Sequence, residues 1–261
     1  MRSCGGPKAS SFLNAIPKVP LFQIGAADFR TILRLRLGLP QPCIRTGVKC
    51  RCGQFPNALG MHYLNCTHGD HLNTRHEVVT KATHEMVQAT AKHSSTKGLE
   101  DTLAGFRNRK GNRLVLDQLV RGFGANGTDV GVDFAICNPC ASTYLQAAKN
   151  KELAAADARC GGKIGKYDVP CKAHDIEFRP AVIELFGAMS PHMEGLISHA
   201  AQLLEDSLPE DTVTTWTADS FSAFHQQRIS VALQKANAKS IRLRSARDTY
   251  TAGRATDGLD A

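Results

Sequence analysis

Four candidate metal ligands lie close together in the sequence. Cys50, Cys52, His62 and Cys66 form the pattern C-x-C-x9-H-x3-C. Two thiols on one short turn, followed by an imidazole and a thiol on consecutive helical turns, can surround a tetrahedral Zn²⁺ ion, and these ligand types suit zinc better than metals that prefer oxygen. The chain holds nine cysteines in all, so the competing interpretation is a set of free side chains without a metal. We predict one structural zinc site, because a closed ligand set leaves no position for a substrate.

The composition is that of one medium domain with a small module attached. The chain has 261 residues, of which 42% are hydrophobic, and this is enough for one core. No apolar run approaches the ~18 residues of a membrane span, and the first residues lack the apolar stretch of a signal peptide. We therefore expect an intracellular protein without membrane contact and with reduced cysteines. The net charge of +8 favours a polyanionic partner such as nucleic acid.

Basic side chains gather in two parts of the chain. A group in the middle, which we assign to nucleic-acid contact, comprises Arg107, Arg109, Lys110 and Arg113. The second group is a basic tail after residue 241. Arg75 lies near a predicted helix start, where the positive end of the helix could help it to bind a phosphate. The competing interpretation of Arg75 is an ordinary solvated arginine.

Composition and hydrophobic spacing divide the chain into five stretches. Residues 1–28 are rich in Gly, Pro and Ser and predict a flexible leader. An amphipathic segment and the zinc module occupy 29–72, and the main domain occupies 73–206. A C-terminal helical extension is expected over 207–247. The small polar residues of 248–261 predict a disordered tail.

The main domain shows alternating helix and strand patterns. Thr74 and Glu77 have the spacing of a capping box, which predicts a helix that starts at Thr74. The expected strands cover 114–120, 130–136 and 181–186. Further helices are expected near 138–156, 190–206 and 218–246. This order predicts an α/β fold with a central mixed sheet flanked by helices.

Two aspartates fall on adjacent predicted strands. Asp117 is in the first strand and Asp133 in the second, and a Gly-rich loop between them would let the strands pair as a hairpin. Alternation places Asp133 on the face opposite Val132 and Phe134. Two convergent carboxylates supply the oxygen ligands that Mg²⁺ requires. The competing interpretation is a turn residue and a solvated residue on an exposed strand face.

Short motifs follow one another in a fixed order through residues 29–190. They are FRTILRLRLGLP, the Cys/His pattern followed by Gly69 and Arg75-His76, Arg113 to Asp117, Val132 to Pro139, Ala147-Ala148, Lys163 to Tyr167, and Phe178 through Gly187. In this order they resemble the C-terminal region of non-LTR retrotransposon proteins. In that region a zinc knuckle precedes a restriction-like endonuclease of the PD-(D/E)XK superfamily. The resemblance implies a restriction-endonuclease-like core with a small N-terminal zinc-binding module.

The resemblance also implies a catalytic site. Asp117 and Asp133 would hold Mg²⁺ against the scissile phosphate, and Glu100 would be a further ligand. The lysine that usually follows the second aspartate by two residues is replaced here by Ala135. A later helix would supply it instead. The candidates are Lys163 and Lys166, with Tyr167 as a supporting donor.

The function implied is a Mg²⁺-dependent DNA endonuclease that nicks its target, so that the 3′-hydroxyl primes reverse transcription. The implied partners are DNA, element RNA and a separate reverse transcriptase chain, because no Tyr/Phe-x-Asp-Asp motif occurs in this sequence. The implied location is the nucleus. An alternative is a catalytically decayed, zinc-containing protein that only binds nucleic acid, and another is a zinc-organised interaction protein. Convergent carboxylates favour the endonuclease, and divergent carboxylates favour the decayed protein.

Overall fold

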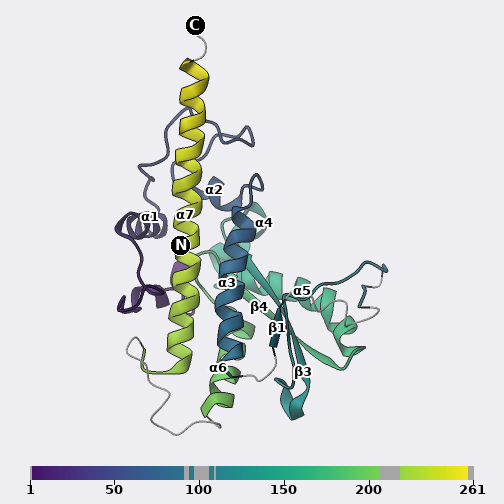
Figure 1. Cartoon of the computed structure of the whole chain (residues 1–261). Coiled ribbons are helices and arrows are strands. Elements are labelled where there is room, and N and C mark those ends of the chain that lie inside the picture. Colours follow the sequence, from purple (N-terminus) through teal and green to yellow (C-terminus); the bar gives the residue numbers. More distant parts are fainter. Residues whose placement is uncertain (1, 91–93, 97–105, 109, 206–217, 258–261) are drawn as a thin grey trace.

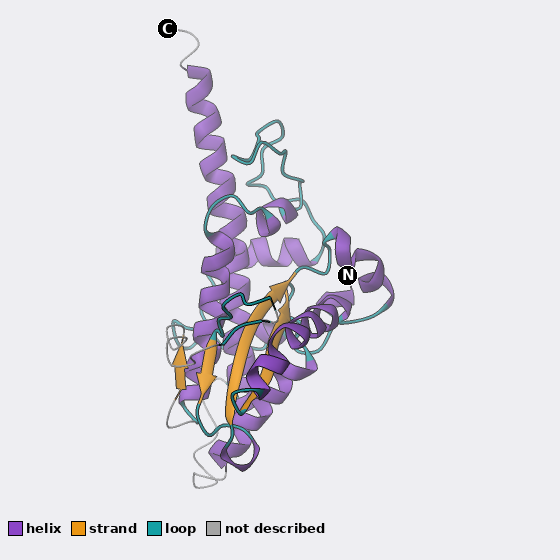
Figure 2. Cartoon of the chain, turned by 90° about the vertical axis from the view of Figure 1, so that its right-hand side faces the viewer, coloured by secondary structure: helices purple, strands orange, loops and turns teal. Residues whose placement is uncertain are grey.

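A small mixed sheet forms the centre of the computed structural model (Figure 2). The structure describes residues 2–90, 94–96, 106–108, 110–205 and 218–257. The strands, in their order across the sheet, are β1 (Ser94–Thr96), β2 (Gln118–Val120), β3 (Asp129–Cys137) and β4 (Ile176–Glu184). The pairs β1–β2 and β2–β3 are antiparallel, and β3–β4 is parallel. The α/β class with a mixed sheet flanked by helices is therefore confirmed.

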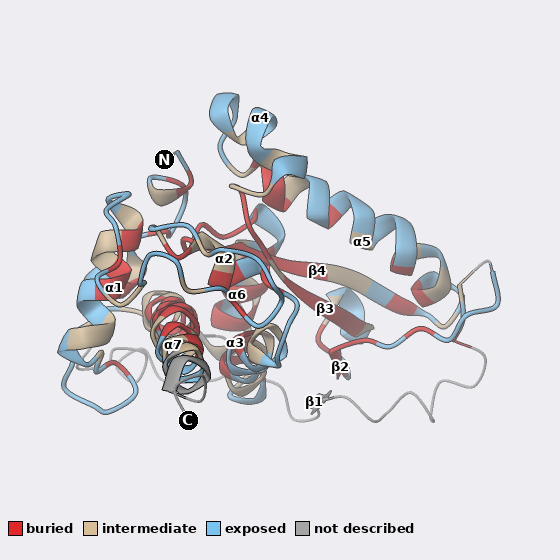
Figure 3. Cartoon of the chain, turned by 90° about the horizontal axis from the view of Figure 1, so that it is seen from above, coloured by how far each residue is buried: buried red, intermediate tan, exposed pale blue. Residues whose placement is uncertain are grey.

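Helices cover both faces of the sheet (Figure 3). One face packs against α5 (Ala154–Lys172), which follows α4 (Ser142–Asn150). The other face packs against α3 (His71–Gln88), α6 (Pro191–Glu205) and α7 (Phe221–Asp257). Outside these layers lie α1 (Ala26–Arg36), α2 (Met61–Asn65) and three short 3₁₀ turns, η1 (Arg2–Cys4), η2 (Ser11–Leu13) and η4 (Ala125–Gly127).

The alternation of β3 sends its side chains into two different environments. Val130, Val132 and Phe134 belong to the largest hydrophobic cluster, together with residues of α3, α6 and α7. Ala135 and Cys137 pack instead against α5. The strand has two faces because successive side chains point to opposite sides. Alternation therefore places Asp133 on the α5 face, as expected from the sequence.

Helix α7 is the longest described helix, and α1, α2, α3 and α6 all pack against it (Figure 1). It runs beside α3, and its last turns extend beyond the rest of the molecule (Figure 1). Part of the buried face of α7 is polar. This part faces the backbone carbonyl of Leu185, which lies directly after the end of β4 and accepts hydrogen bonds from α7. Asn237 Nδ2 donates to this oxygen at 2.8 Å and Gln234 Nε2 at 3.4 Å.

Both ends of the chain differ from expectation. Residues 1–28 do not form a flexible leader in the part that the structure describes, because Phe12 and Phe22 are buried beside Ile32 of α1 and Val231 of α7. Burial of two aromatic rings supplies the free energy that holds this Gly- and Pro-rich segment in place. The expected disordered tail is helical as far as Asp257, because α7 continues into it and no proline interrupts the helix.

The predicted start of α3 is wrong by one turn. The helix begins at His71 with Asp70 at the N-cap, and Thr74 lies inside its first turn. The Thr74 hydroxyl donates to the Asp70 carbonyl at 3.1 Å, so it does not cap a backbone N–H group. A threonine side chain can make this local bond inside a helix as readily as it can cap one.

The first predicted strand is much shorter than 114–120. Leu114 and Leu116 are buried, but only Gln118–Val120 pairs with β3. The side chain of Asp117 accepts a hydrogen bond from the Phe134 N–H at 2.8 Å, and this bond takes the place of the next backbone bond of the ladder. A side-chain acceptor therefore ends the strand.

The predicted helix at 138–156 is two helices. Leu153 has φ of 58° in the left-handed region, and this turn separates α4 from α5. The following helix α5 then runs without interruption through Gly161 and Gly162 to Lys172. Within the described ranges, no helix combines the length and the apolar character that a membrane crossing needs.

We expect His225 to make the protein less stable in acid. Burial lowers the pKa of His225 to about 4, because the ring is 4% exposed beside Phe221 and Phe224. Between pH ~6.5 and ~4 the unfolded chain therefore binds a proton that the folded chain does not. The free energy of unfolding should fall by about 1–3 kcal/mol over this interval, as measured by urea denaturation.

The variant His225→Gln should flatten this part of the pH profile, because glutamine has no charge to gain. The exposed His192 provides a matched control, and His192→Gln should leave the profile unchanged. An identical slope for His225→Gln and the wild type would contradict the assignment.

Candidate metal centre and carboxylate–lysine site

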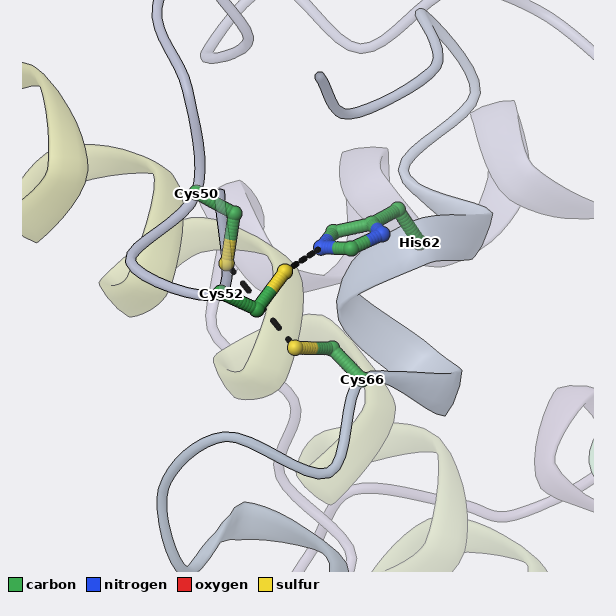
Figure 4. A group of neighbouring side chains, drawn as sticks. All are labelled: Cys50, Cys52, His62 and Cys66. Atoms are coloured by element: carbon green, nitrogen blue, oxygen red, sulfur yellow. Dashed lines mark hydrogen bonds between the residues drawn. The ribbon is translucent and has the colours of Figure 1, made fainter. Parts of the chain in front are cut away.

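The four predicted zinc ligands converge on one point (Figure 4). Their ligand atoms all lie within 4.8 Å of one another, and no second such group of His, Cys, Asp and Glu occurs in the part of the chain that the structure describes. Cys50 Sγ and Cys66 Sγ are 3.8 Å apart, and Cys52 Sγ and His62 Nε2 are 3.4 Å apart. A tetrahedral zinc site has neighbouring S–S and S–N distances of about 3.8 and about 3.5 Å, given its bond lengths. The cluster could therefore hold a zinc ion.

Local backbone geometry explains how each half of the cluster forms. Cys50 and Cys52 lie on a tight turn in which Gly53 N–H donates to the Cys50 carbonyl at 2.7 Å. Gly53 has φ of +87°, a conformation that a residue with a Cβ rarely adopts. His62 lies in α2, and Cys66 is the C-cap of that helix. The spacing of four residues places the imidazole and the thiol on the same side of the helix.

Arg244 of α7 contacts the cluster from outside. Its guanidinium donates to Cys50 Sγ at 3.4 Å and to Cys66 Sγ at 3.2 Å. With Zn²⁺ bound, three thiolates and a neutral imidazole would carry a net charge of −1, which the guanidinium would balance. No signal in the sequence indicates this role, because Arg244 is far from the ligands along the chain and belongs to what was expected to be a basic tail.

The same contact makes the two buried thiols unequal. Burial raises the pKa of Cys50 to about 11. Burial also acts to raise the pKa of Cys66, but the hydrogen bond from Arg244 and other donors outweigh it, and the pKa of Cys66 lies below its ordinary value.

The two aspartates lie side by side at the end of β2. Gln118 pairs with Val132, so one further step of this antiparallel register places Asp117 opposite Asp133, with Cα atoms about 4.5–5.5 Å apart. Both residues are buried, with exposed fractions of 7% and 6%. Each has a positively polarised partner, and the two partners come from helices on opposite faces of the sheet.

Lys163 of α5 forms an ion pair with the Asp133 carboxylate. Its ammonium group also feels the charge of Asp117, which raises its pKa. Burial has the larger effect and lowers the pKa of Lys163 to about 8. Lys163 is therefore within electrostatic reach of both carboxylates. Ala135, two residues after Asp133, is buried under α5.

Lys166 and Tyr167 are oriented differently. Lys166 Nζ lies 2.9 Å from the Tyr167 hydroxyl and 4.4 Å from the centre of its ring. The Tyr167 hydroxyl donates to the Val115 carbonyl at 2.8 Å, so its proton points to the backbone and not to a carboxylate. Burial raises the pKa of Tyr167 to about 12. Tyr167 thus attaches α5 to the segment before Asp117, and Lys163 is the lysine that contacts a carboxylate.

His76 of α3 is a part of this site to which the sequence alone assigned no role. His76 Nε2 lies 3.2 Å from Asp117 Oδ2 and 3.4 Å from the Phe134 carbonyl oxygen. With its N–H at Nε2, the ring donates to this pair of oxygens. The Arg75-His76 motif was the available signal, but its geometry depends on the packing of α3 against the sheet.

Arg75 does not lie where a phosphate contact requires it. It is 6% exposed, and its guanidinium donates to the Leu64 carbonyl at 3.1 Å and to Asn237 Oδ1 at 3.4 Å. Burial lowers its pKa to about 10. The expected nucleic-acid contact at Arg75 is therefore wrong, because the turn of α3 that carries it faces α7.

The remaining basic candidates lie on a turn that leads to Asp117. Arg107 and Arg113 form a β-bridge, Lys110 lies at the tip, and all three are exposed. The predicted contact Arg109 and the predicted magnesium ligand Glu100 lie outside the described residues.

Comparison with known proteins does not add to this description, since no family model and no curated protein matches the chain. The geometry of the two clusters is therefore the basis for assigning a function.

We expect the purified protein to contain one zinc ion per chain. The double variant Cys52→Ser, Cys66→Ser should lose at least nine tenths of it, because only two of the four ligands remain. Chelation of the wild-type metal should lower the melting temperature, since the segment that carries the ligands has little core of its own. Metal analysis by mass spectrometry measures the first effect, and thermal denaturation the second.

The control is Cys43→Ser, which replaces a partly buried cysteine outside the cluster. This variant should keep its zinc. Absence of zinc from the wild type, or equal zinc in the double variant and the control, would exclude the site.

Proposed function

We propose that the protein is a metal-dependent DNA endonuclease that nicks its target, as the motif resemblance implies. One observation carries the proposal: a lysine from α5 meets two adjacent buried aspartates at the end of β2. Lys163 reaches this point from a helix and not from position 135. Lys163 is half-buried, it pairs with the buried Asp133 and its pKa is lowered by burial, and such perturbed groups gather at catalytic sites.

The donor set fits a hard divalent cation. Asp117 and Asp133 offer carboxylate oxygens from adjacent strands, and Mg²⁺ in proteins often takes one or two carboxylates and completes its shell with water and phosphate. When bound, the metal would activate a water molecule and neutralise charge on the phosphate. Two carboxylates can suffice for this role, and Glu100, which lies outside the described residues, remains a candidate for a further ligand.

Each nearby side chain has a distinct role in the proposed reaction. Asp117 Oδ2 accepts a hydrogen bond from the Phe134 N–H and lies beside His76 Nε2. These contacts fix the orientation of the carboxylate, and therefore also the direction in which Oδ1 points. Lys163 would leave Asp133 for the scissile phosphate and stabilise the negative charge that develops there. The exposed turn with Arg107, Lys110 and Arg113 would bind the DNA backbone beside the site.

The zinc module has a structural role in this proposal. Its closed ligand set leaves no position for a substrate, and Arg244 links it to α7. The partners proposed from the resemblance are DNA, element RNA and a separate reverse transcriptase chain in the nucleus, with the nick supplying the 3′-hydroxyl primer.

Nicking of a supercoiled plasmid in the presence of Mg²⁺ tests the proposal. We expect Asp133→Asn to abolish nicking and Lys163→Met to reduce its rate by about 10²–10³-fold, the usual cost of removing one group that stabilises developing charge. Lys166→Met is the matched control, because it removes the adjacent exposed lysine that faces Tyr167. It should change the rate less than tenfold.

Circular dichroism and DNA affinity must stay close to those of the wild type for each variant. Equal nicking by the wild type and by Asp133→Asn would mean that the site is elsewhere or that the activity is a contaminant. DNA binding without nicking by any form would support the decayed protein instead.

Binding to DNA should be mainly electrostatic. Affinity should fall steeply between 50 and 200 mM salt, because each neutralised phosphate releases counterions. The triple variant Arg107→Gln, Lys110→Gln, Arg113→Gln should reduce the slope of log K against log salt by up to about 3. Fluorescence anisotropy with a labelled duplex measures both effects.

The control replaces a basic residue on the opposite face of the sheet. Lys239→Gln removes an exposed lysine of α7 and should leave the slope unchanged. A flat salt dependence of the wild type would rule out this mode of binding.

A further inference from the structure

A long groove lies between α3 and α7, on the face of the sheet opposite Lys163. The two helices run antiparallel, since Arg244 contacts His71 near one end and Arg228 pairs with Glu85 near the other (Figure 1). The groove has a volume of about 770 Å³. Its upper end is lined by the zinc module at His68 and Gly69.

The floor of the groove is apolar and made of small residues. Ala82, Ala232 and Ala236 line it. Because their side chains are short, another molecule can come close to the backbones of α3 and α7. Three larger apolar residues also line the groove, Leu21, Val78 and Leu243, with exposed fractions of 40%, 37% and 64%. Exposed apolar residues that line one hollow indicate a surface that another molecule covers.

The rims of the groove are basic. Lysines and arginines outnumber aspartates and glutamates among its lining residues by eight to three. Arg228 and Arg244 are held by Glu85 and by the zinc-site thiols, but Lys81, Lys239 and Arg247 are exposed. On α7 the basic residues Lys235 and Lys239 are four residues apart, so they stand on one side of the helix.

We propose that this groove binds an amphipathic helix of a partner protein, with acidic side chains on both flanks of its apolar stripe. A helix laid between two others places an apolar stripe on the floor and its flanking residues against the rims. The alanines of the floor give that stripe room, and the lysines of the rims fit carboxylates.

The groove fits a helix better than a strand of nucleic acid. Single-stranded nucleic acid is bound mainly by stacking bases on the rings of Phe, Tyr and Trp, and none of these is among the residues described as lining this groove. Phosphates would also lie on an apolar floor, where they could find few partners. The lined part of α3, from His71 to Glu85, is about 21 Å long, which corresponds to a helix of about four turns.

This site is independent of the proposed nuclease. The groove and the pair Asp133–Lys163 lie on opposite faces of the sheet, and the groove shares no residue with that pair. Binding of a helix can therefore be measured without nicking, and either proposal can fail while the other holds.

Selection from two matched libraries of displayed 18-residue helices tests the proposal on the full-length, zinc-loaded protein. Both libraries vary apolar residues along one stripe, and the flanking positions are fixed as Glu in one library and as Lys in the other. We expect binders only from the Glu library. Their affinities are then measured by fluorescence polarisation against groove variants of the protein.

The groove variants are Leu243→Asp and the pair Lys235→Glu, Lys239→Glu. Each should weaken the selected peptides at least tenfold, and exchange of the peptide's Glu for Lys should restore binding to the charge-reversed pair. Leu243 and Lys239 are exposed, so the variants should fold. The control Lys149→Glu changes an exposed lysine of α4 and should leave the affinity unchanged.

Three results would overturn the proposal. The first is equal enrichment from the two libraries, or none from either. The second is unchanged affinity of the selected peptides for the groove variants. The third is a loss of oligonucleotide binding by the pair Lys235→Glu, Lys239→Glu, which would assign the groove to nucleic acid.

Discussion

The attachment of α7 to the end of β4 is the contact on which the rest of the structure depends. The Leu185 carbonyl accepts hydrogen bonds from Asn237 and Gln234, and Asn237 in turn accepts one from Arg75. Arg75 also donates to the Leu64 carbonyl beside the metal cluster. Both terminal nitrogens of the buried Arg75 guanidinium have acceptors, while its Nε has no hydrogen-bond partner among the described atoms. The two bonds lower the cost of burying the charge and favour one arrangement of the elements around it. The sheet, α3, α7 and the zinc module are joined at this point.

Helix α3 connects the two candidate sites through successive residues. His71 contacts Arg244, which donates to two of the zinc ligands. Arg75 binds the network at Leu185, and His76, the next residue, reaches the Asp117 carboxylate. A rotation of α3 would therefore disturb the metal cluster and the carboxylate pair together. This arrangement gives the zinc module a mechanical role in the proposed nuclease, although it lies apart from the carboxylates.

Three surfaces of the molecule have different chemistry, and this separation supports different partners. The α5 face carries Asp133 with Lys163, and the exposed Arg107, Lys110 and Arg113 precede Asp117 along the chain. The α3–α7 face carries a groove with an apolar floor and basic rims. The metal cluster packs beside α7, whose Arg244 donates to two of its thiols. The basic residues behind the net charge of +8 therefore lie in different surroundings. A lysine beside alanines and a lysine beside aspartates bind different groups.

The sequence by itself determined the features that depend on short spacing. The pattern C-x-C-x9-H-x3-C predicted the metal cluster, and alternation in 130–136 predicted the strand and the face of Asp133. Contacts between distant segments were decided only by the tertiary structure. They include the pairing of Lys163, and not Lys166, with Asp133 and the contact of Arg244 with the thiols. They also include the bond from His76 to Asp117 and the packing of Phe12, in the first segment, against α1 and α7. The reason is physical: spacing fixes which side of a helix or strand a residue occupies, but packing decides what that side faces.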